Sequence, residues 1–178
     1  MIDKNINFHG INIAVLTISD SRNFKDDKSG DVLKEKIEEE GHFCIYREII
    51  KDEPNELLSV LNNWTNDNSL DVIITTGGTG LTVRDITVDT VETYFDKKID
   101  GFGELFRWIS YKKIGTSTIQ SRVTAGTKNG KYIFCLPGSP SACKDAWNEI
   151  LKYQLDIRHK PCNFVEIMPR LKEIEYTK

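Results

Sequence analysis

The sequence has little of what marks several large protein classes. Its 178 residues hold no apolar run near the ~18 residues of a membrane span, and the N-terminus lacks the apolar segment of a signal peptide. Lys and Arg number 24 against 27 Asp and Glu, with no basic run of five or more, which argues against a nucleic-acid binder. We therefore expect a cytoplasmic protein that binds neither nucleic acid nor membrane.

Cysteine and histidine are also scarce, and they are scattered. The four cysteines, Cys44, Cys135, Cys143 and Cys162, include no C-x-x-C pair, and the three histidines lie far apart. These spacings give no reason to expect a disulfide framework, a zinc site or a Ser-His-Asp arrangement.

The first half of the chain alternates between strand and helix patterns. In chain order we predict a strand at 11–20, a helix at 30–40 capped by Ser29, a strand at 42–50, a helix from Pro54 capped by Asp52 or Glu53, and a strand at 70–76. A β-α-β-α-β order with short loops is typical of a parallel sheet covered by helices.

The second half continues with helices and one hairpin. We predict a helix capped by Thr87, a helix through residues 102–109, a β-hairpin over 122–136 turned at Asn129-Gly130, and a helix opened by Ser139 and Pro140. Residues 1–178 are expected to form one domain. Residues from about 161 to 178 show no period, so this tail is expected to be irregular, either loose or lying on a neighbouring subunit.

A glycine-rich turn, 77-GGTG-80, follows the strand that ends at Thr76. Ligands of open α/β sheets bind beyond the carboxyl ends of the strands, and glycine lets a ligand approach the backbone closely. Successive N–H groups in such a turn form an anion site, so the stretch suits a phosphate. It matches neither the P-loop nor the dinucleotide pattern, and a plain tight turn is the alternative.

A carboxylate close to a phosphate site needs a cation between the two. Asp85 lies five residues after the glycine turn, and Asp52 ends a neighbouring strand. Mg²⁺ is held by one or two carboxylates together with substrate phosphates, so this pair predicts a magnesium site. The alternatives are helix capping for Asp52 and a solvated loop acid for Asp85.

Other polar residues are expected at the same edge of the sheet. Ser19 and Asp20 end the first strand, and 137-PGSP-140 is a second turn between a strand and a helix. Two such turns could hold a ligand with more than one anionic group. Four arginines could neutralise phosphate, although a surface salt bridge is the alternative for each of them: Arg22, Arg84, Arg107 and Arg122.

These motifs together resemble one family. The matching segments are 17-TISDSR-22, 75-TTGGTG-80, Arg84-Asp85-x-Thr87-x-Asp89, 101-GFGELFRWIS-110, 120-QSR-122 and 136-LPGSPSACKDAW-147. Their order is similar to that of the MoaB/Mog family of molybdenum cofactor biosynthesis, which includes the molybdopterin adenylyltransferases. The segments GFGELFR, IGTSTIQSR and RHKPCNF resemble the MoaB branch most.

The resemblance implies an α/β fold of three layers, α/β/α, with a mostly parallel sheet and one antiparallel strand, and a homo-oligomer, trimer or hexamer. It implies a transfer of AMP from Mg-ATP to the terminal phosphate of molybdopterin, with Asp52 and Asp85 as catalytic residues and Mg²⁺ ligands. It also implies substrate-binding residues: Ser19, Asp20, Gly77, Gly78, Thr79, Gly80, Ser110, Ser121, Pro137, Gly138 and Ser139.

The alternative within the same pathway is a protein that binds molybdopterin, or assembles with other cofactor biosynthesis proteins, without turnover. The MoaB-like segments and Cys135 motivate it, the latter because many adenylyltransferases have Asn at this position and a thiol offers only one weak donor. The motif R-D-x-T-P-[DE] also has Val88 in place of Pro, which should only loosen the start of the helix.

Overall fold

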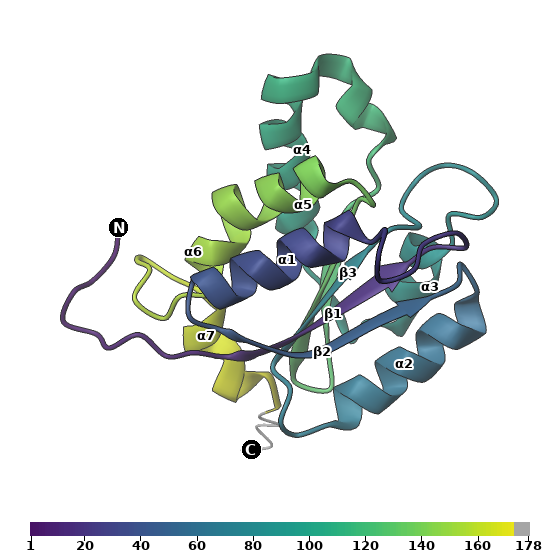
Figure 1. The fold of residues 1–178 in the computed structure, drawn as a ribbon. Helices are drawn as coiled ribbons and strands as arrows, with labels where there is room; N and C mark the ends of the chain where they lie inside the picture. The colour runs from purple at the N-terminus through teal and green to yellow at the C-terminus, as the bar shows by residue number, and fades with distance from the viewer. Residues whose placement is uncertain (173–178) are drawn as a thin grey trace, which may run out of the picture.

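A computed structural model describes residues 1–172, which form a six-stranded sheet covered by helices on both faces (Figure 1). The strands are β1 (Asn12–Ile18), β2 (Phe43–Ile50), β3 (Val72–Thr76), β4 (Lys97–Lys98), β5 (Thr124–Lys128) and β6 (Lys131–Leu136). The longer helices are α1 (Lys28–Glu39), α2 (Pro54–Asn66), α3 (Thr87–Tyr94), α4 (Asp100–Ile114) and α5 (Pro140–Ala146). Shorter helical segments are η1 (Gly115–Gln120), the π-helical turn η2 (Trp147–Leu151), α6 (Lys152–Gln154), α7 (Phe164–Ile167) and η3 (Met168–Lys172).

The strand order is β2-β1-β3-β6-β5-β4. Strands β2, β1, β3 and β6 are mutually parallel, whereas β5 runs antiparallel to both of its neighbours. The predicted mostly parallel sheet with one antiparallel strand is therefore confirmed. Because the chain moves from β1 to β2 on one side and returns to β3 on the other, the carboxyl ends of β1 and β3 form the switch point where open α/β sheets bind ligands.

Two hydrophobic cores lie on opposite faces of the sheet. On one face, alternate residues of the central strands pack against α1, α4, α5 and η2, with Leu33, Phe106 and Trp147 among the buried side chains. On the other face, Leu61 of α2 and Val91 of α3 pack on the intervening strand residues. The expected three-layer α/β/α architecture is confirmed, and Figure 1 shows α1 and α5 on the opposite side of the strands from α2.

Two helix starts differ from the sequence prediction and a third agrees with it. Helix α1 begins before Ser29, and its N-cap is Asp27, whose Oδ1 accepts from the Gly30 N–H at 3.0 Å. The start of α2 agrees with the prediction, since Pro54 is its first residue and Glu53 its cap residue, although the Glu53 side chain makes no capping bond. Thr87 lies inside α3 rather than at its cap, because its hydroxyl turns back and donates to the Gly77 carbonyl at 2.9 Å.

The hairpin prediction is confirmed. Asn129 and Gly130 join β5 to β6 with φ values of 48° and 73°, which a two-residue turn of this kind requires. Ser139 also caps α5 as expected, since its Oγ accepts from the Ala142 N–H at 3.2 Å.

The tail was predicted to be irregular, and this is wrong for residues 164–172, which form α7 and η3. Asn163 caps α7 through a bond from the Glu166 N–H, and Phe164 packs against the rings of Tyr132 and Phe134. Such a short helix leaves no periodic pattern in the sequence. Residues 173–178 lie outside the described part of the chain.

All four cysteines are free thiols. Within residues 1–172, no helix is both long and apolar enough to cross a membrane.

Candidate functional site

A cleft of about 530 Å³ lies at the carboxyl edge of the four parallel strands. Its floor comes from segments that follow β1, β2, β3 and β6. The wall that faces this floor comes from α4 and η1. The cleft is lined by Ile18, Ser19, Arg22, Asp52, Gly77, Gly78, Thr79, Gly80, Arg84, Asp85, Phe106, Ser110, Ile114, Ser117, Thr118, Gln120, Ser121, Pro137, Gly138, Ser139 and Ala142. The structure therefore brings together every residue predicted to be catalytic, metal-binding or substrate-binding except Asp20, whereas the candidate arginines Arg107 and Arg122 do not line the cleft.

The glycine turn requires its glycines. Gly77 has φ +107°, and a Cβ at this position would lie 2.1 Å from the Ile18 carbonyl oxygen. Gly78 has φ +63°, and a Cβ here would lie 2.3 Å from Thr87 Oγ1. The turn is anchored by the Gly77 N–H, which donates to Leu136 at 3.1 Å, and by the Gly78 carbonyl, which accepts from Thr87 at 3.0 Å.

Backbone donors remain free in the cleft. Among residues 1–172, no hydrogen bond uses the N–H groups of Gly78, Thr79, Gly138 or Ser139. Adjacent backbone N–H groups of this kind form a concave anion site. Ser121 adds a buried hydroxyl oxygen that is also without a hydrogen-bond partner in the described part of the chain. Buried polar groups are normally satisfied, so these donors favour a polar, anionic ligand.

Asp52 is fixed by a reciprocal pair of bonds. Its Oδ2 accepts from the Asp20 N–H at 2.9 Å, and its own N–H donates to Asp20 Oδ1 at 3.2 Å. Burial raises the pKa of Asp52, and the negative charges of Asp20 and Asp85 add to this rise. Burial and the neighbouring negative charges therefore both disfavour the ionised form of Asp52.

Asp85 occupies the far side of the same turn. Its Oδ2 accepts from the backbone N–H of Thr82 at 2.8 Å and from the Thr82 hydroxyl at 2.6 Å. Burial opposes ionisation here, but the bonds from Thr82 and Gly80 outweigh it and lower the pKa of Asp85. The two acids thus differ: Asp85 stays ionised to lower pH, while Asp52 is the first of the pair to take a proton.

Arg122 holds the loop that carries Asp85. Its Nε donates to the Gly80 carbonyl at 2.8 Å, and its Nη2 donates to the Asp85 carbonyl at 2.9 Å. The same guanidinium pairs with Asp89. Both ends of the 80–85 loop are therefore fixed by one side chain, which supports Asp85 from behind the cleft.

The second turn, 137–139, is held from the other side. Arg22 Nη2 donates to the Gly138 carbonyl at 2.6 Å, and the Ser29 hydroxyl donates to the same oxygen at 3.1 Å. The Thr76 hydroxyl donates a hydrogen bond to the preceding carbonyl, that of Pro137, at 2.9 Å. This turn therefore has a fixed backbone before any ligand arrives.

Some predicted residues lie elsewhere. Asp20 does not line the cleft, and its carboxylate pairs with Arg84 at 2.8 Å, so it supports Asp52 from outside. Arg107 donates to the Val123 carbonyl at 3.3 Å, and it too lies outside the cleft. Cys135 is completely buried in the core beneath α2 and α3 and does not line the cleft, so one of the two features that motivated the non-catalytic alternative lies away from the site.

The site residues predicted from the sequence do not include those that η1 contributes to the cleft wall. Ser117, Thr118 and Gln120 of η1 line the cleft; they lie in segments that resemble the family, but no local pattern predicts that a 3₁₀ segment forms a cleft wall. Ser29 was interpreted only as a helix cap, although its hydroxyl fixes the Gly138 carbonyl. The sequence gives no signal for that contact, because the two residues are 109 positions apart.

Comparison with known families gives one clear match. The family described as "Probable molybdopterin binding domain" matches residues 14–157. Molybdenum cofactor biosynthesis protein B of Escherichia coli K12 is 42% identical over 161 residues, covering 90% of this chain and 93% of that protein. The protein of the same description from Staphylococcus epidermidis RP62A is 43% identical over 150 residues, covering 82% of this chain and 85% of its own length.

Solved structures agree with this match. A crystal structure of molybdenum cofactor biosynthesis protein B has a TM-score of 0.83 and 36% identity, covering 92% of this chain and 96% of the other. A tungsten cofactor synthesizing protein MoaB from Pyrococcus furiosus has a TM-score of 0.76 and 33% identity, covering 92% and 98%.

Proposed function

The chain belongs to the molybdopterin-binding domain family, among the molybdenum cofactor biosynthesis B proteins, and from this premise we propose that it adenylylates molybdopterin with Mg-ATP. A role in molybdenum cofactor biosynthesis follows from the family itself. The specific reaction is our proposal, and it is supported by the arrangement of the cleft.

The observation that carries the proposal is the convergence of two carboxylates on an anion-binding turn. Asp52 and Asp85 come from different loops, yet both line the cleft that contains the free N–H groups of Gly78 and Thr79. Carboxylates would repel a phosphate ligand on their own. A site built from both kinds of group is suited to a polyphosphate that arrives with a divalent cation.

The donor set fits Mg²⁺. Both candidate ligands are carboxylate oxygens, the type that this hard cation prefers. In residues 1–172 no cluster of three or more His, Cys, Asp or Glu side chains could enclose a metal ion. Two carboxylates with phosphates and water completing the shell is the usual arrangement for Mg²⁺ at a nucleotide site. When bound, the ion would offset the negative charge that accumulates between two phosphate-bearing substrates.

The proposed reaction joins two anions. An oxygen of the terminal phosphate of molybdopterin attacks the α-phosphorus of ATP, and a P–O bond forms. The bond from that phosphorus to the bridging oxygen breaks, and pyrophosphate leaves with the electron pair. Such displacements depend mainly on positioning and on electrostatic stabilisation, so they need no covalent participation by the protein.

The chain supplies positioning through its two turns. The N–H groups of Gly78 and Thr79 would bind phosphate oxygens, and the 137–139 turn with Ser110 and Ser121 would seat the pterin and its phosphate. These donors are held in place before binding, so they cost little reorganisation during the reaction. Asp52 and Asp85 would hold the cation between them.

The test is an activity assay on purified protein with molybdopterin, ATP and Mg²⁺, following adenylylated product and pyrophosphate. We expect wild type to turn over and Asp52→Asn and Asp85→Asn each to lose about 100- to 1,000-fold in rate, the scale of removing one electrostatic contributor. Asp100→Asn is the matched control, since this exposed carboxylate pairs weakly with Lys98 at 3.8 Å outside the cleft.

Two outcomes would contradict the proposal. Absence of product from the wild type, with tight pterin binding retained, would favour the non-catalytic binding protein instead. Equal rates for wild type and Asp85→Asn would show that turnover does not depend on the acid pair.

A further inference from the structure

The arginines around the cleft differ in how their charges are balanced. Arg84 lines the cleft but is paired with both Asp20 and Glu53, and Arg122 is paired with Asp89. Arg22 also lines the cleft, yet in residues 1–172 no carboxylate lies within 4 Å of its guanidinium. The two hydrogen bonds of its guanidinium go to neutral oxygens, the Ser29 hydroxyl at 3.2 Å and the Gly138 carbonyl at 2.6 Å.

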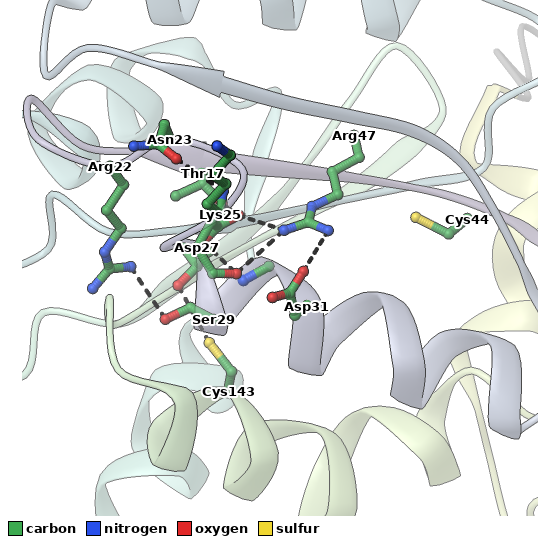
Figure 2. A network of polar contacts seen from close by, with 12 residues as sticks. Thr17, Arg22, Asn23, Lys25, Asp27, Ser29, Asp31, Cys44, Arg47 and Cys143 are labelled. Atoms are coloured by element: carbon green, nitrogen blue, oxygen red, sulfur yellow. Dashed lines mark hydrogen bonds and ion pairs between the residues drawn. The ribbon is translucent and has the colours of Figure 1, made fainter.

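Arg22 is nevertheless held in one position. Figure 2 shows its guanidinium directed at Ser29, at the start of α1. Ser29 is completely buried, and its hydroxyl is itself bonded to the Gly138 carbonyl. The three groups form a closed triangle in which each pair is in contact.

The base of this triangle is anchored in the core. Asp27 is fully buried, and its carboxylate accepts from the Thr17 hydroxyl at 2.8 Å and from Arg47 at 2.9 Å (Figure 2). Gly30 leaves room for that carboxylate, because a Cβ there would lie 2.1 Å from Asp27 Oδ2. The helix start that carries Ser29 is thereby fixed to β1 and β2, so Arg22 is supported by a rigid base.

From these contacts we propose that Arg22 is a ligand-binding residue, which pairs directly with a phosphate group in the cleft, and that Ser29 is its positioning residue. A guanidinium with no carboxylate partner on the wall of an anion-binding cleft retains its charge for the ligand. Its pairing is independent of the Asp52–Asp85 side of the cleft, where a metal ion would mediate contact with phosphate.

The same triangle orients the second turn. In a trans peptide the carbonyl and the following N–H point in opposite directions. Because the Gly138 carbonyl points toward Arg22 and Ser29, the Ser139 N–H points in the opposite direction, where it has no acceptor among the described residues. Arg22 therefore both supplies a positive charge and fixes a neighbouring donor.

The inference rests on the proposed function only in taking the cleft as a phosphate site, so it is tested by binding without turnover. Inorganic pyrophosphate is titrated into wild type, Arg22→Gln and Lys25→Gln in the presence of EDTA, by calorimetry. We expect Arg22→Gln to weaken binding about 10- to 100-fold, the loss of a charge-assisted bond, and more strongly at low salt than at high salt. Lys25→Gln removes the same charge from an exposed position of the same loop and should leave the dissociation constant unchanged.

Two further variants separate charge from structure. Arg22→Lys keeps the positive charge but cannot form bidentate hydrogen bonds, so it should bind pyrophosphate more tightly than Arg22→Gln and more weakly than wild type. Ser29→Ala should weaken binding about 3- to 10-fold, with little further loss when it is combined with Arg22→Gln, because it acts through Arg22. Thermal unfolding of each variant shows that it is folded.

Several results would overturn the inference. They are wild-type affinity in Arg22→Gln, equal losses in Arg22→Gln and Lys25→Gln, or an Arg22→Lys protein as weak as Arg22→Gln. None of these depends on whether ATP is turned over, so failure of the adenylylation assay and failure of this inference are distinguishable.

Discussion

At the scale of single residues, His42 shows how burial changes a titratable group. It is 3% exposed, its Nδ1 accepts from the Ile11 N–H at 3.3 Å, and its ring lies against Phe8 and Trp147. Burial lowers the pKa of His42 to about 4 from 6.5, although the charge of Asp156 opposes the shift. The folded state therefore holds this imidazole neutral.

The sign of the pH effect follows from that shift. Above pH 6.5 neither the folded nor the unfolded state protonates His42, and its contribution to stability is complete. As the pH falls from 6.5 toward 4 only the unfolded state takes up the proton, so the free energy of unfolding should fall, by no more than about 3 kcal/mol. Urea unfolding of wild type and His42→Asn across this window measures the difference, since Asn can still accept from Ile11. Parallel pH profiles for the two proteins would refute the assignment.

Single-residue roles were predictable where one side chain acts locally. Ser139 opens α5 as expected, because Ser before Pro has few other uses at a helix start. Ser29 was assigned to the wrong task, since Asp27 also suits a cap and only the fold shows which of them meets Thr17 and which meets Gly138. The same holds for Asp20, whose partner Arg84 is 64 positions away.

At the scale of elements, the turn after β3 is the most constrained segment of the cleft. Gly77 has positive φ and lies so close to β1 that a Cβ would overlap the Ile18 carbonyl. Gly101, near the start of α4, has no atom within 4 Å of the corresponding position. The two glycines therefore differ in what a methyl group would meet.

Substitution by alanine should have opposite effects at these positions. Gly77→Ala should destabilise the protein by about 2 kcal/mol or more, because strain in φ adds to a backbone clash. Gly101→Ala should stabilise it by up to about 0.5–1 kcal/mol through helix propensity. Urea unfolding gives both values, and a Gly77→Ala protein as stable as Gly101→Ala would contradict the geometry of the turn.

Most elements could be predicted because their hydrophobic pattern extends over several residues. Leu57, Leu61 and Trp64 form one buried stripe on α2, and β3 is an unbroken run of buried residues. Strand β4 could not be predicted, since it consists of two exposed lysines that pair with Thr127 and Gly126 of β5. Its existence depends on a neighbouring strand rather than on its own sequence.

At the scale of the whole molecule, α4 presents an apolar stripe that the described chain leaves uncovered. Leu105, Trp108, Tyr111 and Ile114 are between 42% and 59% exposed, and because they follow one another every three residues, the row they form winds around the helix. Contiguous exposed apolar side chains commonly mark a protein–protein interface. The stripe is compatible with the expected homo-oligomer, trimer or hexamer, which stays a prediction.

Light scattering at micromolar concentration should therefore give a mass above that of one 20.4 kDa chain. Trp108→Glu should shift the population toward smaller species, because it places a charge within the stripe. Val83→Glu is the matched control, as this residue is 96% exposed on the loop between Gly80 and Asp85. A wild-type protein that is purely monomeric would contradict the oligomer.

The order of the strands has a consequence for when the cleft comes into being during synthesis. Strand β6 lies between β3 and β5 in the middle of the sheet, although it is the last strand in the chain. A nascent chain that ends before β6 already contains Asp52, Asp85 and the glycine turn, but it has no 137–139 turn and no Leu136 carbonyl to anchor Gly77. Ligand affinity should therefore report completion of the sheet. Phosphate ligands should stabilise only the finished chain, by an amount that grows with the logarithm of their concentration.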